Sequence, residues 1–152
     1  MRKEHEMFSR HDNGMFKTII LALDGSDGAK QAIPVAAELA EKERAKIVIA
    51  HVTEYMAAKG GELPHAGEDE IRAEIDRQAK ELSDRGIDTK VELADTVLGG
   101  PAPAIVEIAD RNGGDLIVTG TRGHSSVAGI ALGSVAQRLL HIAKRPTLAV
   151  PS

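Results

Sequence analysis

The feature that most constrains this chain is a regular alternation, from Met15 onward, of short apolar runs with segments of helical spacing. The apolar runs, which are predicted to be strands, span residues 16–23, 46–52, 89–94, 115–120 and 146–150. The first, second and fourth runs are almost continuously apolar, which is typical of strands covered on both faces. The segments between the runs place Ala, Ile and Leu at helical spacing. This order predicts a three-layer α/β sandwich with right-handed crossovers.

The length of 152 residues allows one ordinary domain, which we place at residues 15–152. Residues 1–14 mix charges without a periodic apolar pattern, so we expect a flexible N-terminal tail. We find no export signal or spanning segment and expect a cytoplasmic protein without a membrane partner. The absence of cysteine excludes disulfides and thiolate zinc sites, and a net charge of −4 argues against binding nucleic acid.

One connection, residues 53–67, is long for an α/β unit. It contains three glycines and one proline, which disfavour a regular helix. We expect either a mobile flap over the strand ends or a disordered insert.

Two segments that follow predicted strands contain closely spaced glycines. In open α/β sheets ligands bind beyond the carboxyl ends of the strands, so these segments are the candidates for a site. After 115–120 come Gly120 and Gly123, and nine residues later Gly133 and Ser134 open a predicted helix. Glycines let the backbone amides approach an anion, and the first amides of a helix have no internal partner. The pattern indicates a phosphate site, with an ordinary loop before a capped helix as the alternative.

Better-known phosphate loops are excluded by inspection. No Gly in the chain is followed by Lys, so there is no P-loop, and no G-x-G-x-x-G follows the first strand. Arg122 and His124 would add positive charge at the rim of the predicted phosphate site. The histidines have no metal-ligand spacing, and His51, alone at a strand end, is expected to be structural or solvated.

The spacing Gly120-x2-Gly123-x9-Gly133-Ser134 resembles, at every fixed position, the ATP-binding signature of the universal stress protein family, G-x2-G-x9-G-[ST]. The likeness continues in ILALDGS, IVIAHV, DLIVTGTRG and RPTLAVP, which follow the family's order and span about residues 15–152. The resemblance implies a Rossmann-like, adenine nucleotide alpha hydrolase-like fold. Its five-stranded parallel sheet would have the order 3-2-1-4-5.

The resemblance also assigns roles to single positions. Asp24 matches the acidic residue that contacts adenosine, with a helix-capping turn as the alternative role. Thr119 stands where the family usually has a larger apolar residue, often Met. The cofactor-binding residues that we predict from the glycine pattern and the resemblance are Ala22, Leu23, Asp24, Val52, Thr119, Gly120, Arg122, Gly123, His124, Gly133, Ser134 and Val135.

We therefore expect an adenine-nucleotide-binding stress-response or regulatory protein, with ATP hydrolysis slow or absent. The ligand would be ATP, AMP or another adenine nucleotide, with Mg²⁺ on its phosphates. No catalytic residue and no protein-only metal site are predicted. Two alternatives remain: an ATP-consuming enzyme (ATPase or phosphotransferase), and an interaction module whose cleft is empty.

The terminal apolar run bears on assembly. In the implied strand order, residues 146–150 lie at the sheet edge, and an unprotected edge invites pairing with a second chain. We expect a homodimer through this strand, as is common in the family. The alternative is a monomer, because Pro146 and Pro151 flank the run and blunt the edge.

Overall fold

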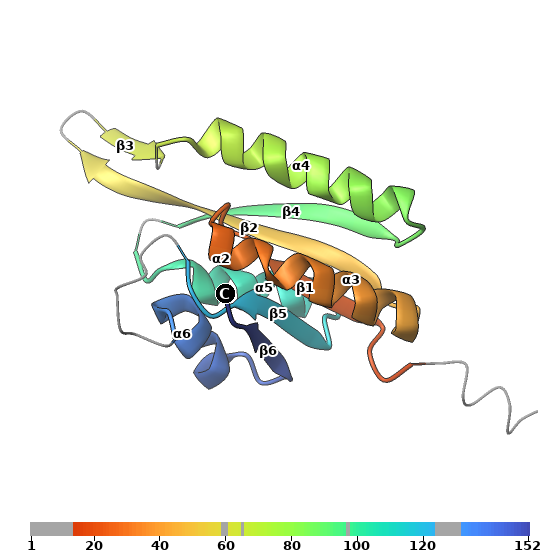
Figure 1. The fold of residues 1–152 in the computed structure, drawn as a ribbon. Helices are drawn as coiled ribbons and strands as arrows, with labels where there is room; N and C mark the ends of the chain where they lie inside the picture. Colours follow the sequence, from red (N-terminus) through yellow and green to blue (C-terminus); the bar gives the residue numbers. More distant parts are fainter. Residues whose placement is uncertain (1–13, 59–60, 65, 97, 124–131) are drawn as a thin grey trace, which may run out of the picture.

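The computed structural model describes residues 14–58, 61–64, 66–96, 98–123 and 132–152 (Figure 1). Of the predicted tail, all but Gly14 lies outside the described residues. None of the helices within these ranges is long and apolar enough to cross a membrane.

Five parallel strands form the central sheet, and their order confirms the predicted 3-2-1-4-5 arrangement. In space the order is β4, β2, β1, β5 and β6, so β1 and β5 are neighbours at the point where the winding reverses. The bounds are β1 Thr18–Ala22, β2 Lys46–Ala58, β4 Thr89–Thr96, β5 Leu116–Gly120 and β6 Thr147–Val150. Every residue of β1 and β5 is buried, as their continuous apolar sequences require.

Helices cover both faces of the sheet (Figure 1). Their bounds are α2 Asp27–Lys30, α3 Ala32–Glu43, α4 Glu68–Asp84, α5 Pro101–Asn112 and α6 Ser134–Ile142. Alternate residues of each central strand pack into two separate cores, because successive side chains of a strand point to opposite faces of the sheet. Ile19 and Leu21 pack with α3 and α4, whereas Ile20 and Ala22 pack with α5 and α6.

The structure differs from the sequence expectation in two places. The connection 53–67 is largely strand: β2 continues to Ala58, and β3, Gly61–Pro64, pairs with it antiparallel. The described residues form a hairpin extension of β2, which Figure 1 shows projecting past the end of β4. The segment of helical spacing between the first two strands forms two helices, α2 and α3, because the helix is interrupted at Gln31, whose N–H bonds the carbonyl of Ala29.

Candidate functional site

A cleft lies at the carboxyl ends of β1, β2 and β5, beside the first residues of α5 and α6. Its volume of about 160 Å³ is well above the roughly 10–15 Å³ that one water needs, so it is a true hollow and not a packing void. The predicted site residues that line it are Ala22, Leu23, Asp24, Val52, Thr119, Gly120, Arg122, Gly123, Gly133, Ser134 and Val135. The twelfth, His124, lies outside the described residues. The fold thus brings eleven predicted positions to one cleft.

Other lining residues were not predicted. Glu54 follows Val52 at the two-residue spacing that keeps strand side chains on one face, a signal that the expectation of a loop from residue 53 obscured. Gly100 and Pro101 bring the start of α5 to the cleft, which only the strand order could indicate. The remaining unpredicted lining residues are Ala29, Ala50, Ile105, Thr121 and Ala136.

The glycines of the motif are required for close packing. A Cβ on Gly120 would lie 2.5 Å from the carbonyl oxygen of Gly28, so the end of β5 rests directly on the backbone of α2. A Cβ on Gly123 would collide with Oδ2 of Asp24. Neither glycine has a positive φ angle, so close packing and not a left-handed backbone requires glycine at these positions. The packing instead places the loop after β5 against the Asp24 carboxylate.

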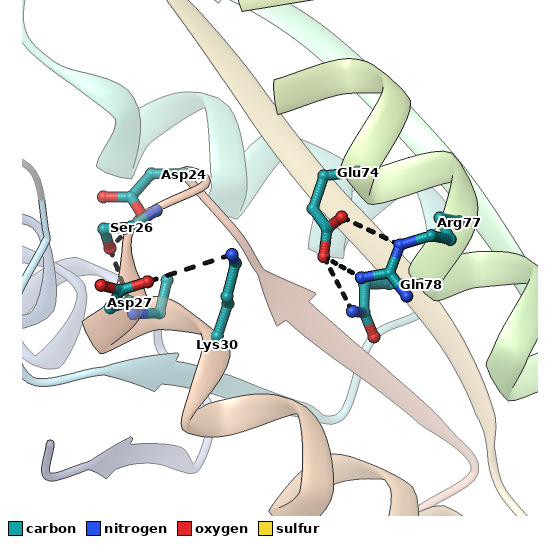
Figure 2. Close-up of polar contacts among 8 residues, drawn as sticks. Asp24, Ser26, Asp27, Lys30, Glu74, Arg77 and Gln78 are labelled. Carbon is teal, nitrogen blue, oxygen red and sulfur yellow. Dashed lines mark hydrogen bonds and ion pairs between the residues drawn. The ribbon is translucent and has the colours of Figure 1, made fainter. Parts of the chain in front are cut away.

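Asp24 holds the turn that joins β1 to α2 (Figure 2). Its Oδ1 accepts hydrogen bonds from the backbone N–H of Ser26 at 2.9 Å and from the Ser26 hydroxyl at 2.5 Å. The hydroxyl oxygen in turn accepts a bond from the N–H of Ala29 at 3.1 Å, so Ser26 is the N-cap of α2. Asp24 therefore forms the turn through one oxygen while its other oxygen faces Gly123.

The first residues of α5 and α6 both line the cleft, but only α6 begins with a run of residues that carry backbone N–H groups. Gly133 is the N-cap of α6, and neither a capping side chain nor an acidic residue occupies the first turn. Ser134 is thus the first helical residue and not the cap, and it is exposed. Gly100 caps α5 with a φ of 73°, and its turn is held by Arg138, whose Nη1 donates to the Gly99 carbonyl at 2.6 Å. Because Pro101 and Pro103 lack N–H groups, the start of α6 is the helix end that attracts an anion.

The remaining candidates bear on metals and bases. Among the described residues, no cluster of three or more His, Asp or Glu side chains could hold a metal ion. His51 does not line the cleft: it is 2% exposed and bonds the Leu23 carbonyl from behind, which agrees with the expected structural role. The charged side chains that do line the cleft are Asp24, Glu54 and Arg122.

Known proteins share this architecture and sequence. The profile of the universal stress protein family matches residues 15–151. A universal stress protein of Thermus aquaticus is 38% identical over 138 residues, which cover 90% of this chain and 99% of that protein. A universal stress protein solved in complex with cAMP is 30% identical with a TM-score of 0.65, over 90% of this chain and 97% of that one.

A more distant structure shares the fold. The universal stress protein of Archaeoglobus fulgidus, solved in complex with dAMP, is 22% identical with a TM-score of 0.65 over 90% of this chain and 98% of that one. Because the family profile spans nearly the whole described fold, and a relative covers the same region at 38% identity, the chain belongs to the universal stress protein family.

Proposed function

We propose that this protein binds an adenine nucleotide in the cleft and acts as a stress-response regulator that hydrolyses ATP slowly or not at all. One observation carries the proposal: the uncapped start of α6, the loop Gly120–Gly123 and the Asp24 carboxylate face one cleft. Relatives solved with cAMP and with dAMP support an adenine nucleotide as the ligand.

The residues present fit such a ligand. Ala22, Leu23 and Val52 would pack against the base, since they form an apolar wall at the strand ends. The Asp24 carboxylate would accept hydrogen bonds from ribose hydroxyls or from the adenine amino group. The phosphates would lie at Gly123, Gly133, Ser134 and Val135, where the amides of α6 begin, with Arg122 at the rim. Mg²⁺ would be held mainly by the phosphates.

The cleft offers little for phosphoryl transfer. Its described lining contains no Lys and no His, and one oxygen of Asp24 is engaged by Ser26. Hydrolysis requires a group that orients water and positive charge that stabilises the leaving phosphate. A phosphate-release assay separates the proposal from an ATP-consuming enzyme: turnover near or above about 1 s⁻¹ would favour the enzyme.

Asp24→Asn tests the site without breaking the turn, because the amide oxygen of Asn can accept both bonds from Ser26. We expect AMP and ATP to bind the variant about tenfold more weakly by calorimetry, since the side chain loses its charge and half of its acceptors. Asp27→Asn is the matched control: it removes the same charge from a fully exposed side chain whose partner is Lys30 at 3.9 Å (Figure 2).

Thermal unfolding tests the ligand class. At a hundred times Kd, bound ligand adds about 2.7 kcal/mol, which for a chain of this size raises Tm by roughly 5–11 °C. We expect this shift with ATP, AMP or cAMP and not with GTP. If no adenine nucleotide raises Tm, the proposal is refuted and the alternative of an interaction module is favoured.

We further propose a homodimer through β6. The strand pairs with β5 on one side and lies at the end of the sheet order. Leu148 within it is 38% exposed, and an apolar edge strand favours pairing with another chain. Light scattering at micromolar concentration should give twice the chain mass of 16.1 kDa. A mass near that of one chain would support the monomer that the flanking prolines suggest.

A further inference from the structure

A buried polar cluster lies directly behind the cleft. Its members are His51 and Thr53 on β2, Glu68 at the start of α4, and Arg72 one turn later. His51, Thr53 and Glu68 are 2%, 0% and 8% exposed, whereas the Arg72 side chain is more open. Oε1 of Glu68 accepts from Thr53 Oγ1 at 2.7 Å and from Arg72 Nε at 3.0 Å, and the same oxygen lies 2.7 Å from Nε2 of His51. The cluster joins the helix to the strand.

The hydrogen bonds of His51 fix the number of protons on its ring. Nδ1 lies 2.8 Å from the carbonyl oxygen of Leu23, which can only accept, so Nδ1 carries a proton. Nε2 faces an oxygen of Glu68 at 2.7 Å. Without a proton between these two atoms, lone pairs would meet at hydrogen-bond distance in a buried site. The His51–Glu68 pair therefore holds one proton beyond that of a neutral imidazole and a free carboxylate.

The surroundings of Glu68 place that proton on the ring. Burial raises the pKa of Glu68, but hydrogen bonds from Thr53, His51 and Arg72 outweigh burial and leave the pKa below its usual value. Arg72 on α4 is the other charge in contact, and Tyr55 on β2 and Asp95 on β4 act on Arg72. Since Thr53, Arg72 and His51 all approach the same oxygen of Glu68 as donors, the geometry indicates an ionised carboxylate and places the shared proton on the His51 ring.

The contacts that run from Glu68 through His51 end at the carbonyl of Leu23, a residue that lines the cleft. Leu23 follows the last residue of β1, and its N–H donates to the Ala50 carbonyl at 3.0 Å. Its carbonyl is held by the His51 side chain, so both peptide groups flanking Leu23 are fixed. The next residue is Asp24, which forms the turn to α2 and faces Gly123.

We propose that His51 is a positioning residue of the nucleotide site: as a doubly protonated ring held by Glu68, it fixes the Leu23 carbonyl and thereby the Asp24 carboxylate. Without its contact to Glu68 the His51 ring no longer holds the Leu23 carbonyl in place, so nucleotide affinity falls when that contact is removed. The effect on affinity rests on the proposed function, whereas the protonation of the ring does not.

Two measurements on the full chain test this proposal separately. Nitrogen-15 spectra of the His51 ring report its protonation without any ligand, and we expect both ring nitrogens to be protonated at neutral pH. Calorimetry with AMP as the probe, on the wild type and on variants of the pair, reports the coupling. We expect AMP affinity to fall about tenfold when the contact between His51 and Glu68 is removed.

Variants of the pair separate positioning from a merely structural role. His51→Gln should bind AMP about tenfold more weakly. Glu68→Gln can donate its amide N–H to Nε2, which keeps the contact with His51 without the extra proton, although Arg72 Nε then loses its acceptor. We expect this variant to carry one ring proton and to bind AMP more tightly than His51→Gln does. Glu70→Gln, an exposed residue in the same turn of α4, is the matched control and should behave as the wild type.

The outcomes are distinct. A wild-type ring with one proton at neutral pH would overturn the proposal. An AMP affinity of His51→Gln equal to that of the wild type would do the same for the coupling. If the wild type binds no adenine nucleotide, the proposed function fails and the coupling with it, and the spectra then decide whether the protonated pair stands alone as a structural bridge. If His51→Gln does not fold, the AMP affinity of Glu68→Gln can still be compared with that of the wild type.

Discussion

A methyl group added at Gly120 should cause a different defect from a methyl group added at Gly123. A Cβ on Gly120 would lie 2.5 Å from the carbonyl oxygen and 2.9 Å from the carbonyl carbon of Gly28, which are backbone atoms that cannot rotate away. A Cβ on Gly123 would instead meet the terminal oxygen of the Asp24 side chain. The first clash must move α2 against β5, whereas the second must move only the carboxylate that faces the cleft.

The magnitudes follow from these neighbours. Overpacking of this kind costs about 1–3 kcal/mol, so Gly120→Ala should lower Tm by roughly 2–12 °C for a chain of this length. Gly123→Ala should change Tm by less, but by displacing the Asp24 carboxylate it should weaken AMP binding about tenfold.

Thermal unfolding and calorimetry on both variants give the comparison. Gly113→Ala is the control, because its Cβ meets nothing within 4 Å although its φ is 64°. It should lose about 1–2 kcal/mol through backbone strain and keep full AMP affinity, since Gly113 does not line the cleft. Equal loss of stability and affinity in the two test variants would refute the assignment of separate roles to these glycines.

Two further predictions concern single polar contacts. Hydrogen bonds from Arg77 and then Gln78 lower the pKa of Glu74 from 4.5 to about 2 (Figure 2), so its stabilising effect is complete above the unfolded value and is lost as pH falls toward 2. Glu74→Gln should therefore flatten the acid limb of the stability–pH curve at low salt. Because the Arg77 side chain is 56% exposed and that of Glu74 is 28% exposed, the difference should shrink at high salt; a difference that salt does not reduce would contradict this. Arg138→Ala removes the 2.6 Å bond to the Gly99 carbonyl, which should loosen the turn before α5 and weaken AMP binding a few-fold by calorimetry. An unchanged affinity would show that this turn does not shape the cleft.

Much of the fold could be predicted because its signals are local. The continuous apolar runs of β1 and β5 are fully buried, and the helical spacing of Ile75 and Leu82 places both in the core beneath α4. The hairpin was missed because glycine and proline were taken to indicate a loop, whereas Tyr55 and its neighbours continue the strand and pair with β3.

The sequence predicted the parts of the candidate site that a motif marks. It did not predict the parts that can be located only from the order of the strands. The glycine pattern and Asp24 locate the loops of the cleft in the sequence itself. The contributions of Gly100 and Pro101 depend on α5 beginning beside β1, which no local pattern encodes. The partners of His51 depend on where α4 begins, so sequence alone could indicate a structural histidine but not its bond to Glu68.

The contact between α2 and the end of β5 has a mechanical consequence. Gly120 rests on Gly28, and a Cβ on Gly28 would in turn lie 2.5 Å from the carbonyl oxygen of Arg122. Main chain touches main chain there, so no side chain can rotate to absorb a displacement. A ligand that pushes the segment around Arg122 toward α2 would therefore move the short helix with it.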